Sequence, residues 1–316
     1  MSNSAPPKDA VSVIDQEFIV DQPSPVAVDL PKAIVHLRPG SASDRLRVNV
    51  AVSGCPAADA EAVLDRLGVS TQQVKDTVRV STDPDETAAD WWRWLRTHDV
   101  TVHVELGLPS RIQADLRVPS GEVDIADLAG EVDLNLMGGS CRLSNLTGTL
   151  RVRAESSAVT IEDFSGEELE ARVAVGTLTL NDIEADTIRL RSVAAPVTLS
   201  DATGATTVTA NSTEVHLQAL EGPCTVHSQG GPLQFDGAPS AETELTVVGS
   251  TLDVHLPADH AAQLTMNGES LSLDDQFAFE GERTEHTIEG TLNDGGPSLL
   301  ARAVGGSGTC RVRARD

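Results

Sequence analysis

Residues 121–161 read GEVDIADLAGEVDLNLMGGSCRLSNLTGTLRVRAESSAVTI, and the same short pattern continues as far as Pro257. Each copy contains an alternating apolar pair, a turn with Asp or Asn, in most copies a glycine, and a second apolar pair. The first pairs recur at steps of 18 or 19 residues. A fixed period of this length indicates a repeat architecture. These pairs are Val123/Ile125, Cys141/Leu143, Val159/Ile161, Leu178/Leu180, Val197/Leu199, Val215/Leu217, Leu233/Phe235 and Leu252/Val254.

The alternation predicts short strands with one buried face. Val123 and Ile125 point to one side of such a strand, and Asp124 points to the other. One short strand buries too little to be stable, but the same strand of the next copy can pair with it about 4.8 Å away. Parallel layers that follow one another along the chain normally wind with a right hand. We therefore expect a mainly β fold, a right-handed parallel β-solenoid with two or three strands per coil.

The turn residues recur at one position of the repeat. Asp and Asn side chains accept hydrogen bonds from nearby backbone N–H groups, and glycine adopts positive φ without steric cost. We interpret these residues as structural corners. The alternative, a calcium-binding ladder, lacks the glycine-rich nonapeptide of calcium-binding β-rolls. The predicted corner residues are Asp127, Asn145, Asp163, Asp182, Asp201, Gly130, Gly148, Gly166, Gly204 and Gly222.

The net charge of −25 argues against nucleic acid and anionic membranes as partners, because both carry the same sign. Only three of the 23 basic residues are Lys, and there is no Tyr. An acidic, Lys-poor surface is typical of proteins that stay soluble in concentrated salt. We favour this halophilic interpretation. The alternative is an acidic face for a cationic partner or a metal.

No catalytic or metal-binding motif is recognisable. The four cysteines, Cys55, Cys141, Cys224 and Cys310, are far apart and lack the spacing of a zinc site. Nucleophile-elbow, phosphate-loop, dinucleotide-binding and H-E-x-x-H patterns are missing. Outward acids are too common to single out a catalytic carboxylate pair. We interpret His216, His227 and His255 as surface residues, and we expect no enzyme activity, metal or cofactor.

The rest of the chain suggests three regions. Residues 1–15 look like a flexible tail, residues 16–108 like an α+β cap with a helix from Ala57 to Gly68, and residues 109–316 like the solenoid. After Pro257 the rhythm loosens. We expect one more coil at 264–273, an acidic loop or hairpin at 276–294, and a closing coil at 299–313.

All three tryptophans, Trp91, Trp92 and Trp94, lie in one segment. We favour a plug that covers the first coil, since a solenoid needs its end covered and large rings do this well. The alternative is a binding platform for a carbohydrate or a partner protein.

The first ten residues, MSNSAPPKDA, lack the basic and apolar regions of a signal peptide. No apolar run reaches the length of a transmembrane helix. These features predict a cytoplasmic protein without direct membrane insertion, with cell-surface association as the alternative.

Three stretches carry a resemblance to a known family: VTVHVELGLPSRIQADLRVPSGEVDIADLAGEVDL, the SG-x-V/I-x-I-x-D/N-L-x-G coils, and DVHLPADHAAQL followed by NGESLSL. Over roughly residues 100–316 the chain resembles the bacterial "putative adhesin" domain family, a family of unknown function related to the head domains of auto-transporter adhesins. The resemblance implies a β-solenoid without assigned catalysis.

These observations support a non-enzymatic, adhesin-like binding or scaffold protein that takes a protein or polysaccharide partner. Two alternatives stay open. One is an intracellular, bactofilin-like scaffold that polymerises end to end, because unpaired terminal strands are templates for stacking. The other is a carbohydrate-active β-helix enzyme.

Overall fold

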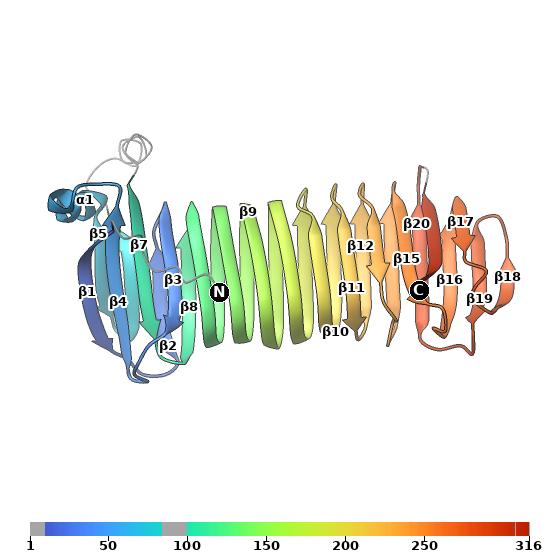
Figure 1. The fold of residues 1–316 in the computed structure, drawn as a ribbon, viewed down its shortest axis with the longest axis horizontal. Coiled ribbons are helices and arrows are strands. Elements are labelled where there is room, and N and C mark those ends of the chain that lie inside the picture. Colours follow the sequence, from blue (N-terminus) through green and yellow to red (C-terminus); the bar gives the residue numbers. More distant parts are fainter. Residues whose placement is uncertain (1–9, 84–99, 307, 316) are drawn as a thin grey trace. The chain divides into compact units, whose positions relative to one another are not determined.

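The computed structural model describes residues 10–83, 100–306 and 308–315 (Figure 1). The fold is mainly β, with 21 strands and one short α-helix among these residues. The chain divides into two compact units, residues 1–157 and 158–316, which we describe separately. Strand β9 (Gly121–Val193) winds through several coils and contributes residues to both units.

In residues 158–316, consecutive coils pair in parallel with the period that the sequence predicts. Val197 pairs with Leu178 on one side and with Val215 on the other. Further along, Val215 pairs with Leu233, and Leu233 pairs with Leu252. The sequence steps of 18 or 19 residues are therefore the distances along the chain between residues that pair in consecutive coils. The strands are β10 (Val197–Asn211), β11 (Val215–Glu221), β13 (Leu233–Asp236) and β15 (Thr251–Pro257).

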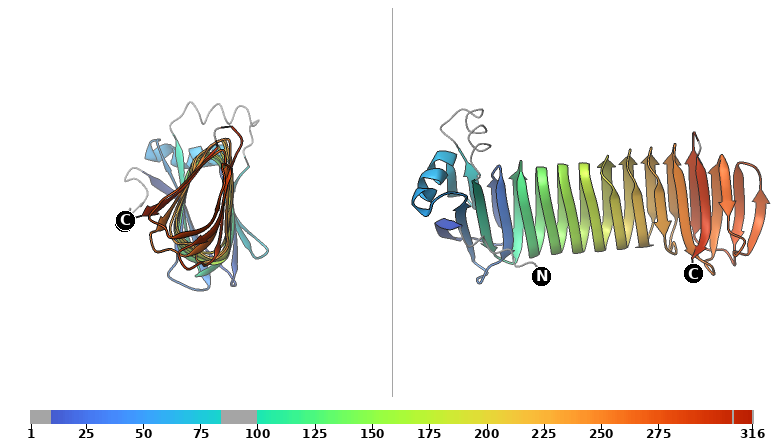
Figure 2. Two further views of the ribbon diagram at one scale, coloured as in Figure 1. Left: turned by 90° about the vertical axis from the view of Figure 1, so that its right-hand side faces the viewer. Right: turned by 45° about the horizontal axis from the view of Figure 1, so that its top comes forward.

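A second ladder completes each coil. Within β10, Thr206 pairs with Cys224 of β12 (Cys224–Gln229), and Cys224 pairs with Thr243 of β14 (Thr243–Val248). Each of these coils thus contributes two strand segments, and the view along the stack shows them one behind another (Figure 2). The inward side chains form a dry column, and members of the first ladder are at most 1% exposed, namely Leu178, Val197, Val215, Leu233 and Leu252.

Cysteines fill inward positions of the second ladder as small apolar side chains do. Cys224 is buried, and burial raises the pKa of its thiol to about 12. The thiol therefore stays protonated and unreactive near neutral pH. All four cysteines are free.

The last coil in the sequence is not the last coil in the stack. The ladder of β14 and β15 continues directly into β20 (Ser298–Val304) and β21 (Thr309–Arg315). On the opposite edge, β20 pairs with β16 (Ala262–Gly268) and β21 pairs with β17 (Ser270–Leu273). The C-terminal coil therefore lies between two coils that precede it in the sequence.

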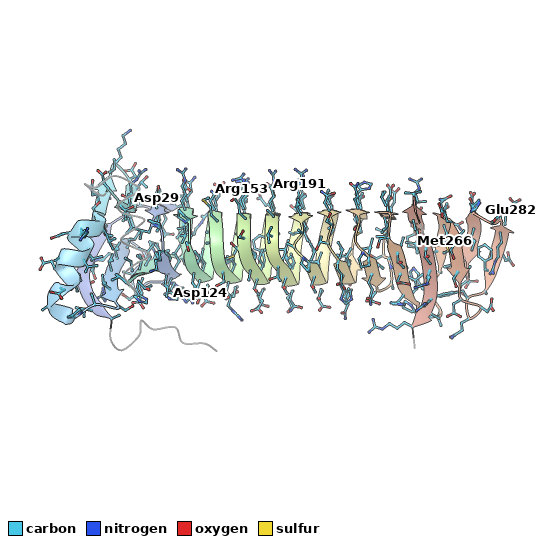
Figure 3. The ribbon with its side chains drawn as sticks, turned by 90° about the horizontal axis from the view of Figure 1, so that it is seen from above. Asp29, Asp124, Arg153, Arg191, Met266 and Glu282 are labelled. Carbon is cyan, nitrogen blue, oxygen red and sulfur yellow. The ribbon has the colours of Figure 1, made fainter. Side chains whose placement is uncertain are left out.

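The segment before this coil forms a hairpin, one of the two forms that the sequence predicts. Strand β18 (Phe279–Arg283) runs antiparallel to β19 (Thr287–Leu292), and β19 also runs antiparallel to β16. The side chain of Glu282 on β18 is labelled in Figure 3 and is exposed. Because β19 occupies the far edge of β16, the returning chain pairs with the near edge.

In residues 1–157, an N-terminal segment supplies a coil that the repeat spacing does not predict. Strands β2 (Ser24–Asp29) and β3 (Ala33–Pro39) pair in parallel with β8 (Arg111–Val118) and β9. Val26 lies opposite Ala114, and Val35 lies opposite Val123. The partners are 88 residues apart in the numbering, so an 18-residue period cannot reveal them.

On their other edges β2 and β3 pair in parallel with β6 and β7, and antiparallel pairs and the helix complete this unit. Strand β4 pairs antiparallel with β1 and with β7, and β5 pairs antiparallel with β6. Helix α1 packs against β1, β4 and β5. It ends at Gly68, whose left-handed φ of 64° suits a glycine C-cap. The elements are β1 (Val11–Ile19), β4 (Arg45–Ser53), a 3-10 turn (Ala57–Asp59), α1 (Ala60–Leu67), β5 (Val69–Val74), β6 (Thr77–Thr82) and β7 (Thr101–Leu108). No helix among the described residues has the length and apolar character needed to span a membrane.

The inward column gives the first prediction. Leu178→Asp places a carboxylate where the side chain is 0% exposed, so we expect a loss of at least about 3 kcal/mol in the free energy of unfolding. Thr179→Asp, on the exposed face of the same strand, is the control and should change it by less than about 1 kcal/mol. Chemical denaturation followed by circular dichroism measures both. Equal stability of the two variants would contradict the inward assignment.

Candidate functional site

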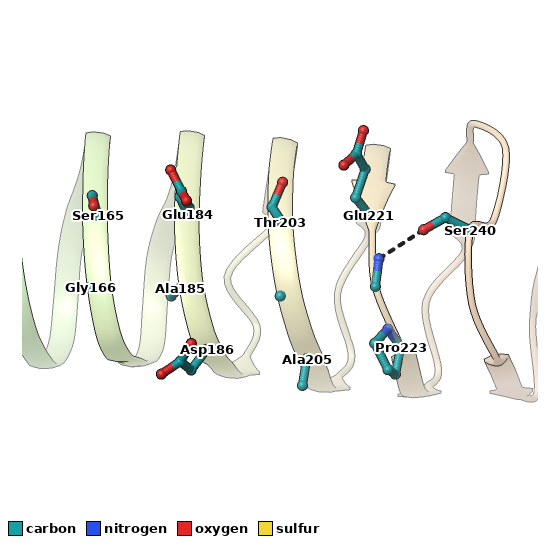
Figure 4. A pocket seen from close by; sticks show the side chains of 12 residues that line it. Ser165, Gly166, Glu184, Ala185, Asp186, Thr203, Ala205, Glu221, Pro223 and Ser240 are labelled. Carbon is teal, nitrogen blue, oxygen red and sulfur yellow. Dashed lines mark hydrogen bonds between the residues drawn. The ribbon is translucent and has the colours of Figure 1, made fainter.

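An open groove of about 670 Å³ follows one row of corners in residues 158–316 (Figure 4). It crosses successive coils, and its floor consists of small residues. Glycine is required at position 204 because the coil backbones approach closely there. A Cβ on Gly204 would lie 1.7 Å from the carbonyl oxygen of Ala185, and its φ is +135°. The floor residues are Gly166, Ala185, Gly204 and Gly222.

Mostly polar side chains form the two walls of the groove. Glu184, Thr203 and Glu221 lie in one row, because Thr203 pairs in register with each of the other two. Ser240 closes this row, and its Oγ accepts a hydrogen bond of 3.0 Å from the backbone N–H of Gly222. The remaining wall residues are Ser165, Asp186, Ala205 and Pro223.

The carboxylates of the groove have no counter-charge among the described residues. Glu184, Asp186 and Glu221 make no hydrogen bond or ion pair with any part of the chain that the structure describes, and no cationic side chain lines the groove. Glu184 and Glu221 lie two coils apart, which is roughly 10 Å at the usual strand spacing. The groove can therefore accept positively charged or hydrogen-bond-donating groups at that interval.

The groove floor gives the second prediction. In Gly204→Ala the new methyl group collides with the neighbouring coil, so we expect a loss of more than about 3 kcal/mol in unfolding free energy. Gly249→Ala is the matched control, since its φ is also positive, at +73°, but its Cβ would meet nothing within 4 Å. It should cost about 1 kcal/mol from backbone strain alone. Thermal melts compare the two, and similar costs would show that close packing does not require the glycine.

A second polar cluster lies on the outward face of the first ladder. The carboxylate of Asp236, on β13, accepts three side-chain hydrogen bonds. His216 Nε2 is 2.7 Å from Oδ2, His255 Nδ1 is 2.6 Å from Oδ1, and Gln234 Nε2 is 2.7 Å from Oδ2. The Asp236 side chain is 13% exposed. His216 and His255, which the sequence predicts as surface residues, are thus joined through one carboxylate.

Burial and hydrogen bonding shift the pKa of Asp236 in opposite directions. Burial raises the pKa of its carboxyl, but the hydrogen bonds from His255, His216 and Gln234 outweigh burial, and the pKa lies below its ordinary value. Repeat spacing misses this contact because it aligns His216 with Gln234 and His255 with Asp236, in two neighbouring columns. The bond from His216 to Asp236 runs diagonally between them. His227 is exposed on β12 and does not join the cluster.

A cavity of about 300 Å³ opens beside this cluster. His255 and Asp236 line one side, and residues of the inserted strand β21 line the other. Because the sequence does not predict where β21 pairs, it does not predict this cavity either. The lining residues are Gln218, Asp236, His255, Ala314 and Arg315.

The lowered pKa of Asp236 gives the third prediction. A carboxyl whose pKa is lower in the folded state stabilises the fold above its unfolded pKa, and this contribution is lost as pH falls through the folded pKa. We expect Asp236→Asn to be less stable than the unmutated protein near neutral pH. The difference should shrink once the pH falls below the ordinary Asp value of 3.8. Denaturation at several pH values tests this, and a difference that stays constant down to strong acid would contradict it.

Most of the predicted corner residues have positive backbone φ angles. The backbone φ angles of the aspartates are positive, at 61° for Asp127, 54° for Asp163, 55° for Asp182 and 52° for Asp201. Asn145, with φ of 50°, donates a 2.7 Å hydrogen bond from Nδ2 to Oδ1 of Asp127. Of the predicted glycines, Gly130, Gly148, Gly204 and Gly222 also have positive φ, whereas Gly166 does not belong to this set.

The remaining predicted site residues, Trp91, Trp92 and Trp94, lie outside the described residues. Within residues 10–83, 100–306 and 308–315, no group of three or more His, Cys, Asp or Glu residues is arranged to hold a metal ion.

Among solved structures, the chain has distant matches. No protein-family model and no curated protein matches the chain. A solved structure described as a "putative cell adhesion protein" from Clostridium sporogenes ATCC 15579 is 10% identical, with a TM-score of 0.20, over 96% of this chain and 99% of its own. Another, described as a "putative adhesin" from Bacteroides fragilis NCTC 9343, is 9% identical, with a TM-score of 0.30, over 98% and 99%. At these values neither match establishes the fold or the activity of this chain.

Proposed function

We propose that the chain is a non-enzymatic, adhesin-like binding protein whose groove in residues 158–316 holds an extended, positively charged polypeptide segment. The single observation that carries this proposal is the set of three carboxylates in the groove that have no partner in the described chain. A carboxylate row with no counter-charge attracts cations and forms its strongest hydrogen bonds with Arg and Lys. The resemblance of residues 100–316 to an adhesin domain family is compatible with this role.

The spacing of the groove favours an extended ligand. Glu184 and Glu221 belong to coils that are two apart, roughly 10 Å along the stack. In the extended polyproline II conformation three residues make one turn and span roughly 9 Å, so basic side chains at positions i and i+3 lie on one face and match the two carboxylates. The hydroxyls of Ser165 and Thr203 lie in the same wall and can bind the peptide backbone.

Two finer features of the fold belong to this proposal. We infer that the coils wind with a right hand, as parallel connections within one sheet normally do. We also infer that parts of residues 16–108 act as a cap. Antiparallel pairing of β4 with β1 and of β5 with β6 supports the cap, because it interrupts the parallel stack within residues 1–157.

End-to-end polymerisation has less support than binding in the groove. The edge strand β18 carries Glu280, Glu282 and Arg283, all of which are exposed. Charged side chains on an edge strand oppose pairing with another chain. For catalysis, no observed arrangement favours a particular reaction over simple binding.

The fourth prediction tests the groove. We expect the full chain to bind a fluorescein-labelled peptide with Arg at positions i and i+3 and Pro residues between them, which favour the polyproline II conformation. The affinity should fall as salt rises, because the groove carboxylates are open to solvent. Glu184→Gln/Glu221→Gln should weaken binding about tenfold, as expected when two charge-assisted hydrogen bonds are lost. Fluorescence anisotropy measures the dissociation constants.

The control separates the groove from the overall charge. Glu214→Gln combined with Asp201→Asn removes the same two charges at exposed positions that do not line the groove, and Asn suits the positive φ of 52° at position 201. This variant should bind the peptide as the unmutated protein does. Equal weakening in both double variants, or no binding of the peptide by the unmutated protein at low salt, would overturn the proposal.

A further inference from the structure

We propose that the cavity beside Asp236, His255 and Arg315 is a second binding site, which takes one acidic sugar unit through its carboxylate and a neighbouring hydroxyl. The site shares no lining residue with the groove, so it does not depend on the function proposed for the groove. It is formed by β11, β13, β15 and the inserted strand β21.

The carboxylate of Asp236 orients His255. Its two oxygens already accept hydrogen bonds from His216, His255 and Gln234, so its acceptor sites are occupied inside the protein. An ionised carboxylate only accepts hydrogen bonds, and the Nδ1 of His255 must therefore carry the proton in the 2.6 Å contact. In the neutral ring this leaves Nε2 as an acceptor. A ligand hydroxyl is the group that such an acceptor binds.

Arg315 supplies the cationic group of the site. Two other arginines of β20 and β21 form ion pairs within the protein: Arg311 lies 3.4 Å from Asp253, and Arg302 lies 3.3 Å from Glu244. Arg315 is exposed at the cavity and pairs with no carboxylate in the described residues. A guanidinium fork binds a carboxylate with two parallel hydrogen bonds.

A second arginine adds to the positive potential. Arg313 lies in register with His255 on the adjacent strand, is exposed, and also has no acidic partner among the residues described. In a chain with a net charge of −25, two unpaired arginines beside one cavity form a local cationic surface. Such a surface attracts an anionic ligand and disfavours the basic peptide proposed for the groove.

An acidic sugar satisfies all the polar groups of the cavity together. Its carboxylate suits Arg315, and its ring hydroxyls can donate to His255 Nε2 and exchange hydrogen bonds with the amide of Gln218. The volume of about 300 Å³ is at the lower end for small-molecule sites, which suits one sugar unit. The cavity is open, so the remaining units of a polysaccharide can extend into solvent.

The fifth prediction tests this site with the full chain by isothermal titration calorimetry. The probe is a trimer of galacturonic acid, and a trimer of galactose is the neutral match. We expect binding of the acidic trimer only. Arg315→Gln should weaken it about tenfold or more, and Gln218→Ala about threefold to fivefold, as typical for losing a charged and a neutral hydrogen bond. His255→Gln, which removes the Nε2 acceptor, should weaken it about fivefold.

Three controls make the result decisive. Arg191→Gln removes an equal charge at an exposed position outside the cavity, labelled in Figure 3, and should leave binding unchanged. Glu184→Gln/Glu221→Gln should also retain binding, which separates this site from the groove. Thermal melts identify any variant that fails to fold, and Arg315→Gln and Gln218→Ala, which do not touch the His–Asp contact, then decide the outcome.

Several results would overturn the proposal. Binding of the galactose trimer as tight as that of the acidic trimer would remove the role of the carboxylate. If Arg191→Gln lost as much affinity for the acidic trimer as Arg315→Gln, the effect would come from overall charge and not from the cavity. Inorganic phosphate that displaces the acidic trimer at a similar concentration would assign the cavity to small anions instead of sugars. Absence of heat with the acidic trimer would remove the site.

Discussion

The backbone pairing between successive coils, at steps of 18 or 19 residues, is the constraint on which the other features of residues 158–316 depend. This pairing places each inward side chain directly on the corresponding side chain of the next coil, so Leu178, Val197 and Val215 form one water-free column. The same register aligns the outward residues and the corners. Glu184, Thr203 and Glu221 form a straight wall for this reason, and the close approach at Gly204 keeps side chains out of the groove floor.

The two candidate sites use this register in different ways. The groove depends on repetition, because equivalent residues of several coils make its floor and walls. The cavity beside His255 depends on a departure from repetition, because it needs a diagonal contact between columns and residues from β21. Their charges are also opposite. Carboxylates without a partner among the described residues line the groove, whereas Arg315 and the oriented imidazole line the cavity, so the ligands proposed for the two sites carry opposite charges.

Local repetition explains how much of the fold could be predicted. Alternating residues such as Val197 and Leu199 predict both the strands and their parallel partners, because the partner is always one period away. Non-local pairing leaves no such signal. Val35 pairs with Val123 across 88 residues, and Leu299 pairs with both Thr243 and Leu264, between two coils that precede it in the sequence. The groove floor could be predicted, because it consists mainly of the corner glycines. The contact between His216 and Asp236 could not, because it joins two neighbouring columns and the repeat spacing aligns residues only within one column.

The position of β20 and β21 between earlier coils has a consequence for the order of events during translation. The ribosome releases β14 to β17 before it has made the strands that join them. Until residues 298–315 emerge, the exposed edges of β14 and β15 on one side, and of β16 and β17 on the other, lack their native partner. Unpaired edges recruit other strands, so the nascent chain is exposed to mispairing at this point, and the emergence of residues 298–315 ends that exposure.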